Sequence, residues 1–284
     1  MKEYVLELNN GKKLKAIITN EELIYGVTAV AVGTKNEYLN LGSDETKLNA
    51  IYAYHPVTHE RIDIVVLDNK MLSMSAMLLV PAHIKEHFDI AEKFGLNFKQ
   101  VVAPYFKGVD EEALNPNAET QFRRSVIVVV KDPKTDKYLC VNAVKRVCKS
   151  FVMGGIEGNE TIEEAALRET AEETGYTDVE ITRVSMFELH NHFYAAYKGV
   201  NRYAHLYVAF GKLNSDAHEE PSEEELAKQT TLWLNKEELK DFLSVNNNIF
   251  VYNYILDKDY AYEADGMMIN SNEFNGKLRS EVAK

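Results

Sequence analysis

Three glutamates, Glu169, Glu172 and Glu173, follow one another at spacings typical of a single helix face. Carboxylates held this close repel one another. The repulsion is relieved by an arginine, by a hard divalent cation or by a raised pKa. Arg168 alone cannot neutralise three negative charges. The pattern therefore predicts a site for Mg²⁺ or Mn²⁺, with a solvated acidic helix surface as the alternative.

The surrounding residues predict the helix that must carry these side chains. Thr161 and Glu164 have the spacing of a capping box, and Gly175 can adopt the left-handed conformation that ends a helix. We therefore expect a helix from Ile162 to Thr174. An inner stripe of small and apolar residues has helical spacing and comprises Ile162, Ala165, Ala166 and Thr170.

The whole stretch resembles the Nudix hydrolase box, G-x5-E-x7-R-E-U-x-E-E-x-G-U. Its fixed places correspond to Gly154, Glu160, Arg168, Glu169, Glu172, Glu173 and Gly175. Thr170 occupies an aliphatic place of that box. The glycine turn is one residue shorter than usual, so the box glycine is either Gly154 or Gly155.

The resemblance implies a metal-dependent Nudix pyrophosphohydrolase that cleaves the pyrophosphate linkage of a nucleoside diphosphate derivative, with Mg²⁺ or Mn²⁺ as cofactor. By position, Glu172 and Glu173 would be the principal metal ligands and Glu169 a ligand or the general base. Arg168 would orient the glutamates. A carbonyl of Gly154 or Gly155 would complete the metal shell.

Substrate-binding residues are expected outside the box, and each is otherwise ordinary surface or packing. Candidates for phosphate contacts are Arg123, Arg124, Lys145, Arg146, Lys149 and Arg202. Candidates for stacking on a base are Phe193, Tyr194, Tyr197 and Tyr203. Glu188 and the acidic run 223–225 could supply a further acid from a loop, although such runs are usually solvated.

Composition limits the remaining functions. The chain has 284 residues, a formal net charge of −12 and a pI of about 5.2, which disfavours a general surface for nucleic acid or an anionic membrane. The two cysteines, Cys140 and Cys148, have no metal-ligand spacing and predict reduced thiols. No apolar stretch approaches a membrane span, and the start has no features of a leader. We expect a soluble cytoplasmic protein; its oligomeric state, a homodimer included, stays open.

The first part of the chain predicts a β-rich domain with one packed helix. Residues 4–8 and 14–18 have the pattern of a hairpin around an Asn-Gly turn. Further strands are expected at 26–32, 62–68 and 77–80. Pro81 is expected to open a helix that ends at Gly95.

Residues 49–102, with Tyr52-Ala53-Tyr54-His55-Pro56 and Leu79-Val80-Pro81-Ala82-His83, resemble the editing domain of leucyl-tRNA synthetase. Residues 261–276 resemble the closing segment of that domain. The two matches imply a discontinuous editing-like domain at 1–115 and 257–284, with a Nudix domain inserted at 116–256. Such an insertion costs little when the ends of the host loop are close together.

Several pocket residues of that editing domain are replaced here. The Thr-Arg-Pro-Asp-Thr segment corresponds to residues 19–23, the Gly-Thr-Gly turn to residues 73–75, and His87 stands where an aspartate would hold the ammonium group. His83 and His87 would either share a metal or be ordinary surface or core histidines. The alternative functions are a free-standing aminoacyl-tRNA deacylase or a non-catalytic nucleotide- or tRNA-binding module.

The expected fold class is α+β: a Nudix-type α/β/α sandwich with a mixed sheet, inserted into the β-rich editing-like domain. Residues 107–121 predict a linker. Strands are expected at 125–130, 138–144, 180–189, 203–210 and 231–234. Asn235 and Glu238 are expected to cap a last helix.

Overall fold

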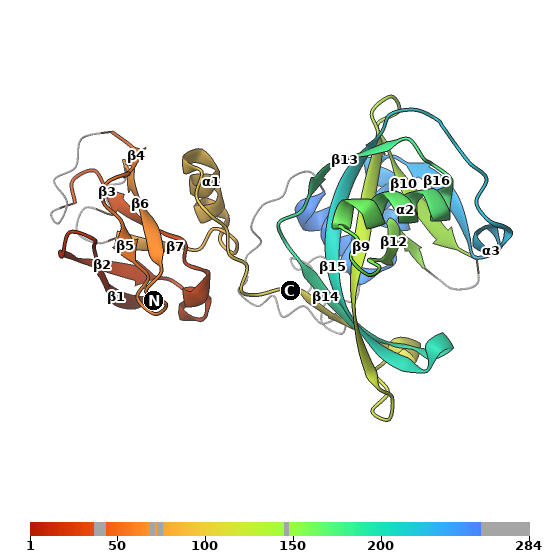
Figure 1. Cartoon of the computed structure of the whole chain (residues 1–284), viewed down its shortest axis with the longest axis horizontal. Helices are drawn as coiled ribbons and strands as arrows, with labels where there is room; N and C mark the ends of the chain where they lie inside the picture. The colour runs from red at the N-terminus through yellow and green to blue at the C-terminus, as the bar shows by residue number, and fades with distance from the viewer. Residues whose placement is uncertain (37–43, 69–71, 73–75, 145–147, 257–284) are drawn as a thin grey trace. The chain divides into compact units, whose positions relative to one another are not determined.

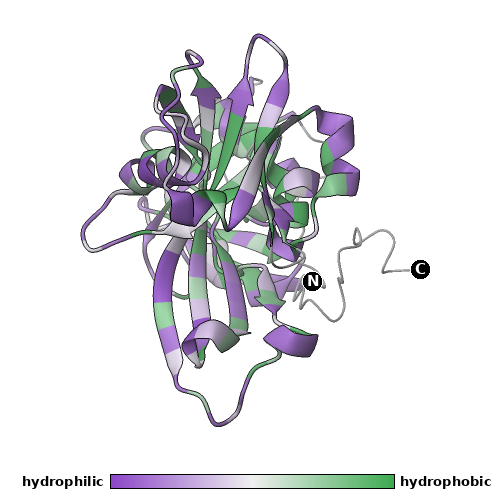
Figure 2. Ribbon diagram, turned by 90° about the vertical axis from the view of Figure 1, so that its right-hand side faces the viewer, coloured by the Kyte–Doolittle hydropathy of each residue, from purple (hydrophilic) through white to green (hydrophobic). Residues whose placement is uncertain are grey.

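The computed structural model describes residues 1–36, 44–68, 72, 76–144 and 148–256. These residues form two compact units, one comprising residues 1–102 and the other beginning at residue 103 (Figure 1). Each unit has its own sheet. Figure 2 shows hydrophobic residues concentrated on the interior strands and hydrophilic residues on the outer turns.

The first unit is β-rich, as predicted. Its strands are β1 (Lys2–Glu7), β2 (Lys13–Ile18), β3 (Ala29–Gly33), β4 (Thr46–Lys47), β5 (Ala53–Tyr54), β6 (Arg61–Leu67) and β7 (Ala76–Leu79). Gly11, with a φ of 79°, makes the turn of the β1–β2 hairpin. A short 3₁₀ helix, η1 (Glu21–Gly26), precedes β3.

The described strands of this unit form one sheet in the order β1-β2-β7-β3-β6-β4, with β5 paired to β6. Every residue of the central strand β3 is buried, as its continuous apolar run predicts. Ala31 and Leu79 pack on one face with Ala91 of the helix α1 (Lys85–Phe94). Val30 and Leu78 face the other core.

The helix α1 begins four residues later than predicted, at Lys85 and not at Pro81, because residues 81–83 form a turn. It ends at Gly95 as expected, with a φ of 59°. His83 therefore precedes the helix. Its Nε2 accepts a hydrogen bond from the backbone N–H of Val101 at 2.9 Å, and His87 Nδ1 accepts one from Val80 at 3.0 Å. Both side chains are buried, which supports the interpretation as core histidines.

The second unit carries a larger mixed sheet. Its strands are β8 (Tyr105–Lys107), β9 (Thr120–Asp132), β10 (Lys137–Ala143), β11 (Lys149–Ser150), β12 (Val152–Gly155), β13 (Val179–Val184), β14 (Leu189–Ala195), β15 (Val200–Leu213) and β16 (Gln229–Leu234). Its helices are η3 (Asp110–Glu112), α2 (Ile162–Thr174), η4 (Ala196–Lys198), α3 (Glu223–Leu226), α4 (Lys236–Phe242), α5 (Asn246–Phe250) and the π-helix η5 (Val251–Ile255).

The path through this sheet is β11-β10-β9-β15-β14-β8, with β12 paired to β9, β13 to β15 and β16 to β10. The strand β9 pairs with β15 in parallel and with β12 antiparallel. Because β8 pairs with β14, residues 103–115 pack with the second unit, and the expected linker contains the end of β8, η3 and the start of β9. The predicted return of the chain at residue 257 lies outside the described residues.

Helices cover both faces of this sheet, which confirms the predicted fold class. Val126 and Val128 of β9 pack on Ala166 of α2. From the other side, the Asn248 amide of α5 contacts Met153 of β12, with 3.0 Å between Nδ2 and the sulfur. Figure 1 shows α2 in front of the long strands and the blue C-terminal helices behind them.

The described residues also show the character of the helices and the state of the two cysteines. Among these residues, no helix is both long and apolar enough to cross a membrane. Cys140 and Cys148 are both free thiols. Burial raises the pKa of the Cys140 thiol to about 12, so this group is inert near neutral pH.

We expect acid to weaken the first unit through His83 and His87. Burial lowers the pKa of each histidine to about 4, whereas in the unfolded chain it is about 6.5. The stabilisation from keeping them neutral is therefore complete above about pH 6.5 and is lost as the pH falls toward 4. The protection of β6 amides against hydrogen exchange, taken relative to the intrinsic exchange rate at each pH, should therefore decrease over this range.

The matched variants are His87→Gln, which removes one of the three buried imidazoles of this unit (His55 is the third), and His59→Asn, which removes a histidine in a left-handed turn that asparagine tolerates. His87→Gln should flatten the pH dependence of β6 exchange and His59→Asn should not. Equal pH slopes in all three proteins would contradict the assignment.

Candidate active site

The helix α2 has the predicted bounds, Ile162–Thr174, and the predicted capping box is complete. The backbone N–H of Glu164 donates to Thr161 Oγ1 at 3.1 Å, and that of Thr161 donates to Glu164 Oε2 at 2.9 Å. Gly175 ends the helix with a φ of 79°. These caps fix which face of α2 carries the acidic side chains.

Arg168 is the centre of an ion-pair network on this face. Its Nε lies 2.7 Å from Glu160 Oε1. Its Nη1 lies 2.9 Å from Glu169 Oε1 and 3.0 Å from Glu172 Oε2. Arg168 thus contacts two of the three glutamates, and its role in orienting them for chemistry stays a prediction.

The same guanidinium also binds the loop 155–160 that precedes α2. Arg168 Nη2 donates to the carbonyl of Gly155 at 2.7 Å. Glu160 additionally accepts the backbone N–H of Glu157 at 2.8 Å. The hydrogen bond from Arg168 is the main cause that lowers the pKa of Glu160 to about 2. Residues 155–160 are therefore bound to the helix at both ends.

The two glycines of β12 give room to different side chains. A Cβ at Gly154 would lie 1.7 Å from the carboxyl carbon of Glu169, whereas a Cβ at Gly155 would lie 2.5 Å from Nη2 of Arg123. Burial raises the pKa of Glu169, and its Arg168 contact opposes that rise. Gly154 is thus the glycine that borders the acidic group, which supports its choice as the box glycine.

Glu173 lies apart from the Arg168 network. Its Oε2 is buried and has no hydrogen-bond partner among the described residues. Burial, and then the charge of Glu169, raise the pKa of Glu173 to about 8. An ionised carboxylate in such a place needs a positive partner. The oxygen atoms of Glu169, Glu173 and the Gly154 carbonyl are donors of the type that a hard divalent cation prefers.

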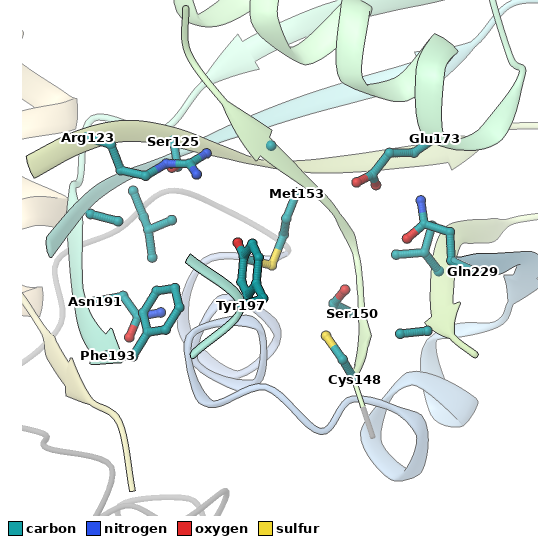
Figure 3. Close-up of a pocket in the computed structure, with 15 residues that line it drawn as sticks. Arg123, Ser125, Cys148, Ser150, Met153, Glu173, Asn191, Phe193, Tyr197 and Gln229 are labelled. Carbon is teal, nitrogen blue, oxygen red and sulfur yellow. The ribbon is translucent and has the colours of Figure 1, made fainter. Parts of the chain in front are cut away.

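The three glutamates do not converge on one point. Among the residues that the structure describes, the group whose ligand atoms all lie within 4.8 Å of one another is Glu188, His190 and His205. Arg168 holds Glu169 and Glu172, while Glu173 points toward Gln229 (Figure 3). Joint coordination therefore requires side-chain rotation, and the metal roles of these residues stay a prediction.

A cavity of about 220 Å³ begins at Glu173. Figure 3 shows Glu173 and Gln229 on one side of it and Asn191, Phe193 and Tyr197 on the other. Its remaining lining residues are Arg123, Ser125, Val141, Ala143, Cys148, Ser150, Met153, Gly154, Ala204 and Leu206. A carboxylate, an arginine and two aromatic rings thus line one space.

Strand alternation decides which predicted substrate residues reach this cavity. Arg123 lines it and donates from Nε to Ser125 Oγ at 2.8 Å. The next residue, Arg124, points to the opposite face, with its guanidinium 5.6 Å from the Tyr207 ring centre. Of the aromatic candidates, Phe193 and Tyr197 line the cavity.

The other candidates are distributed as follows. Arg202 lies opposite Phe193 in the register and acts electrostatically on Arg123, without lining the cavity. Tyr203 is on the opposite face, packed on Phe122 at a ring-centre distance of 5.4 Å. Tyr194, opposite Asn201, does not line the cavity either. Lys145 and Arg146 lie outside the described residues.

The acidic candidates outside the box are bound to other groups. Glu188 bonds to histidines, and the acidic run 223–225 forms α3, where Lys228 pairs with two of its glutamates. Four polar lining residues, Asn191, Ser125, Ser150 and Gln229, are not among the sequence-based candidates. The first two follow from Phe193 and Arg123 by the two-residue period of a strand; no local pattern marks Gln229.

The NUDIX domain family model matches residues 121–252 of the chain. Two solved structures are similar. A NUDIX hydrolase from Nitrosomonas europaea has 19% identity and a TM-score of 0.35, covering 51% of this chain and 95% of that one. The Ap4A hydrolase of C. elegans has 20% identity and a TM-score of 0.33, covering 43% and 86%.

The N-terminal part is similar to leucine–tRNA ligases. The identity is 32% over 102 residues for the ligase of Acinetobacter baumannii (strain SDF), covering 34% of this chain and 11% of that protein. It is 44% over 55 residues for that of Synechococcus sp., covering 19% and 6%. The chain spans about a tenth of these ligases or less. These matches and the domain match confirm the two predicted resemblances.

We expect Gly154→Ala to weaken Mn²⁺ binding more than Gly155→Ala does. The methyl group at position 154 would overlap the carboxylate of Glu169, whereas that at position 155 would displace only the end of Arg123. Isothermal titration with Mn²⁺ should show a loss of about tenfold or more for the first variant. Equal affinities would mean that Gly154 and Glu169 do not belong to the metal site.

We expect Glu173→Gln to stabilise the metal-free protein. The raised pKa of Glu173 means that the wild type loses stability as the pH rises from about 4.5 to about 8. In EDTA, the advantage of the glutamine variant should therefore grow from pH 5 to pH 8.5 and reach about 3 °C or more in melting temperature.

Trp233, the sole tryptophan of the chain, lies on β16 of this unit and donates to Tyr176. Its fluorescence therefore reports the unfolding of the second unit. If the gain in melting temperature of Glu173→Gln over the wild type were the same at every pH, the ionised form of Glu173 would not be destabilised by burial.

Proposed function

Residues 121–252 form a Nudix domain, and from this premise we propose that the chain is a metal-dependent pyrophosphohydrolase acting on a nucleoside diphosphate derivative. The observation that carries the proposal is the buried Oε2 of Glu173, which lacks a partner among the described residues at the edge of the cavity. A divalent cation would supply the missing positive charge.

Glu169, Glu172, Glu173 and the carbonyl of Gly154 would hold Mg²⁺ or Mn²⁺. When bound, the ion would neutralise the charge of the diphosphate and lower the pKa of a bound water. Arg168 would keep Glu169 oriented and the loop 155–160 closed against the helix, as its bonds to Glu160 and Gly155 support. Glu169, or whichever glutamate stays free of metal, would take the proton from the attacking water.

The cavity supports a nucleotide as the rest of the substrate. Arg123 is positively charged and held in place by Ser125, so it would contact a phosphate. Phe193 and Tyr197 offer ring faces to a base. The amides of Asn191 and Gln229 can donate to and accept from the edges of the base or sugar.

For the first unit we propose a role as scaffold or substrate-binding module, in a discontinuous domain interrupted by the Nudix domain. Deacylation of aminoacyl-tRNA is disfavoured here. His87 stands at the place of the ammonium-binding aspartate, and its low pKa of about 4 keeps it neutral. Its Nδ1 also accepts the backbone N–H of Val80. A neutral, occupied imidazole cannot replace the missing carboxylate.

The activity should depend on metal and on the glutamates of α2. Release of a nucleoside monophosphate is measured with Mg²⁺ and Mn²⁺ on dinucleoside polyphosphates, ADP-ribose, sugar nucleotides, coenzyme conjugates and nucleoside triphosphates, with aminoacyl-tRNA as the comparison. Glu172→Gln and Glu173→Gln should each lower kcat about 100-fold or more. Glu163→Gln, an exposed glutamate in the first turn of the same helix, is the control. Unchanged turnover in both site variants would refute the assignment.

Substrate affinity should depend on Arg123 and not on Arg124. Arg123→Gln removes a charged partner of a phosphate and should raise KM about tenfold or more. Arg124→Gln makes the same chemical change one residue away, on the opposite face of the sheet. Steady-state kinetics on the best substrate of the screen compares the two; equal effects would show that the substrate does not occupy the cavity of Figure 3.

A further inference from the structure

A second cluster of ligand-type side chains lies on the face of β14 and β15 away from the cavity. His190 and His205 face each other directly across the two strands, and Glu188 immediately precedes β14. In the register, Asn191 pairs with Ala204 and both line the cavity. Their neighbours His190 and His205 therefore point to the other side. The cluster is thus separate from the nucleotide cavity.

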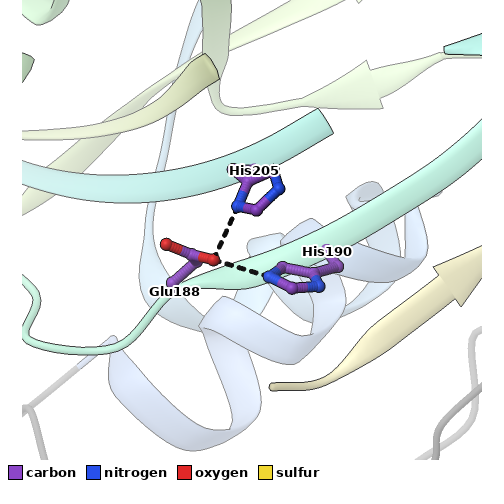
Figure 4. Close-up of side chains that lie close together, drawn as sticks. All are labelled: Glu188, His190 and His205. Carbon is purple, nitrogen blue, oxygen red and sulfur yellow. Dashed lines mark hydrogen bonds and ion pairs between the residues drawn. The ribbon is translucent and has the colours of Figure 1, made fainter. Parts of the chain in front are cut away.

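One carboxylate oxygen joins the two imidazoles. Glu188 Oε1 lies 2.6 Å from His190 Nε2 and 2.8 Å from His205 Nδ1 (Figure 4). All three atoms lie within 4.8 Å of one another. Because an ionised carboxylate can only accept hydrogen bonds, each histidine must carry a proton on the nitrogen that faces Glu188. These two protons occupy the space between three potential ligand atoms.

We propose that Glu188, His190 and His205 form a site for a divalent transition-metal ion of the Zn²⁺ class. Two imidazole nitrogens and one carboxylate oxygen are a donor set that suits Zn²⁺ and not Mg²⁺, which prefers oxygen donors alone. Binding requires no net loss of a proton from a neutral histidine. The proton moves from the nitrogen facing the metal to the other ring nitrogen.

The surroundings of His190 provide for that second tautomer. Its Nδ1 lies 2.9 Å from the hydroxyl of Tyr203, so Nδ1–H can donate to this oxygen once Nε2 binds metal. Tyr207 in turn hydrogen-bonds Glu188. Such outer contacts fix ligand orientation at metal sites. This assigns Tyr203, expected from the sequence as a base-stacking residue, the different role of positioning a metal ligand.

The geometry needs only a small adjustment to admit the ion. Zinc–ligand bonds of about 2.0–2.2 Å in a tetrahedral shell place neighbouring ligand atoms roughly 3.4 Å apart. The present oxygen–nitrogen distances of 2.6 and 2.8 Å would therefore lengthen by less than about 1 Å. The side chains are 29% (Glu188), 23% (His190) and 37% (His205) exposed. Water can therefore reach the fourth position.

Zinc uptake by the untagged full-length chain tests the proposal. Metals are first removed with EDTA, and Zn²⁺ is then titrated in competition with a chromophoric chelator. The buffer contains about 10 mM Mg²⁺, which reduces the binding of Zn²⁺ to the glutamates of α2. The wild type should bind one Zn²⁺ tightly. His190→Asn and His205→Asn should each lower that affinity by about 100-fold or more, and Tyr203→Phe by about tenfold.

Two further variants distinguish this site from zinc binding elsewhere in the chain. Glu172→Gln with Glu173→Gln should keep the tight Zn²⁺ equivalent, because those residues belong to the proposed Mg²⁺ site. His59→Asn, which removes a histidine from the first unit, should keep it as well. Circular dichroism verifies folding of each variant. X-ray absorption of the zinc-loaded protein should show two imidazoles at the metal.

Three results would overturn the proposal. These are equal Zn²⁺ affinity in the wild type and the two histidine variants, loss of the tight equivalent in the α2 variant, or a zinc shell without imidazole. The outcome does not depend on hydrolysis. The zinc-site proposal can therefore be refuted while the proposed hydrolase activity is confirmed, and the hydrolase activity can be refuted while the zinc site is confirmed.

Discussion

The site depends on one arginine that is shared by several acceptors. Arg168 contacts Glu160, Glu169 and Glu172 and the carbonyl of Gly155. A guanidinium has donors in a fixed planar fork, so it can satisfy several oxygens at defined angles, which a lysine cannot do. The acidic face of α2 and the preceding loop are therefore one electrostatic unit. That loop has little regular structure of its own, and the arginine supplies the constraint that a strand or helix would otherwise give.

Arg168 does not contact Glu173, and this difference gives Glu160 and Glu173 different roles. Glu160 is held ionised by Arg168, which lowers its pKa to about 2, while burial raises the pKa of Glu173 to about 8. Carboxylates whose environments push their pKa values apart serve different roles. Glu160 stabilises the fold, whereas Glu173 costs stability in the absence of a positive partner. A buried carboxylate oxygen without a partner gains the most from a bound cation, because the cation offsets the cost of burying its charge.

Elements with local signals are predictable from the sequence, whereas those set by tertiary contacts are not. The caps of α2, Thr161 and Gly175, determine its bounds because both act through neighbouring backbone groups. The predicted start of α1 is too early, since proline at position 81 is equally compatible with the turn that the structure has there. Short β8 has no local signal because its partner β14 is far along the chain. The spacing identifies Glu173, but its separation from the Arg168 network follows from burial, which no spacing reveals.

The substrate residues are only partly predictable for the same reason. A strand alternates its side chains, so composition can show that Arg123 and Arg124 are both candidates without showing which one faces the cavity. The pairing of Gly155 with Ser125 decides this, because it fixes the face of β9 that β12 and the cavity share. Phe193 of β14 and Ala204 of β15 line the same cavity. Their side chains alternate with those of His190 and His205, which therefore lie on the other face. The registers of β9 with β15 and of β15 with β14 therefore assign the side chains of both sites, and a slip of one residue would exchange them.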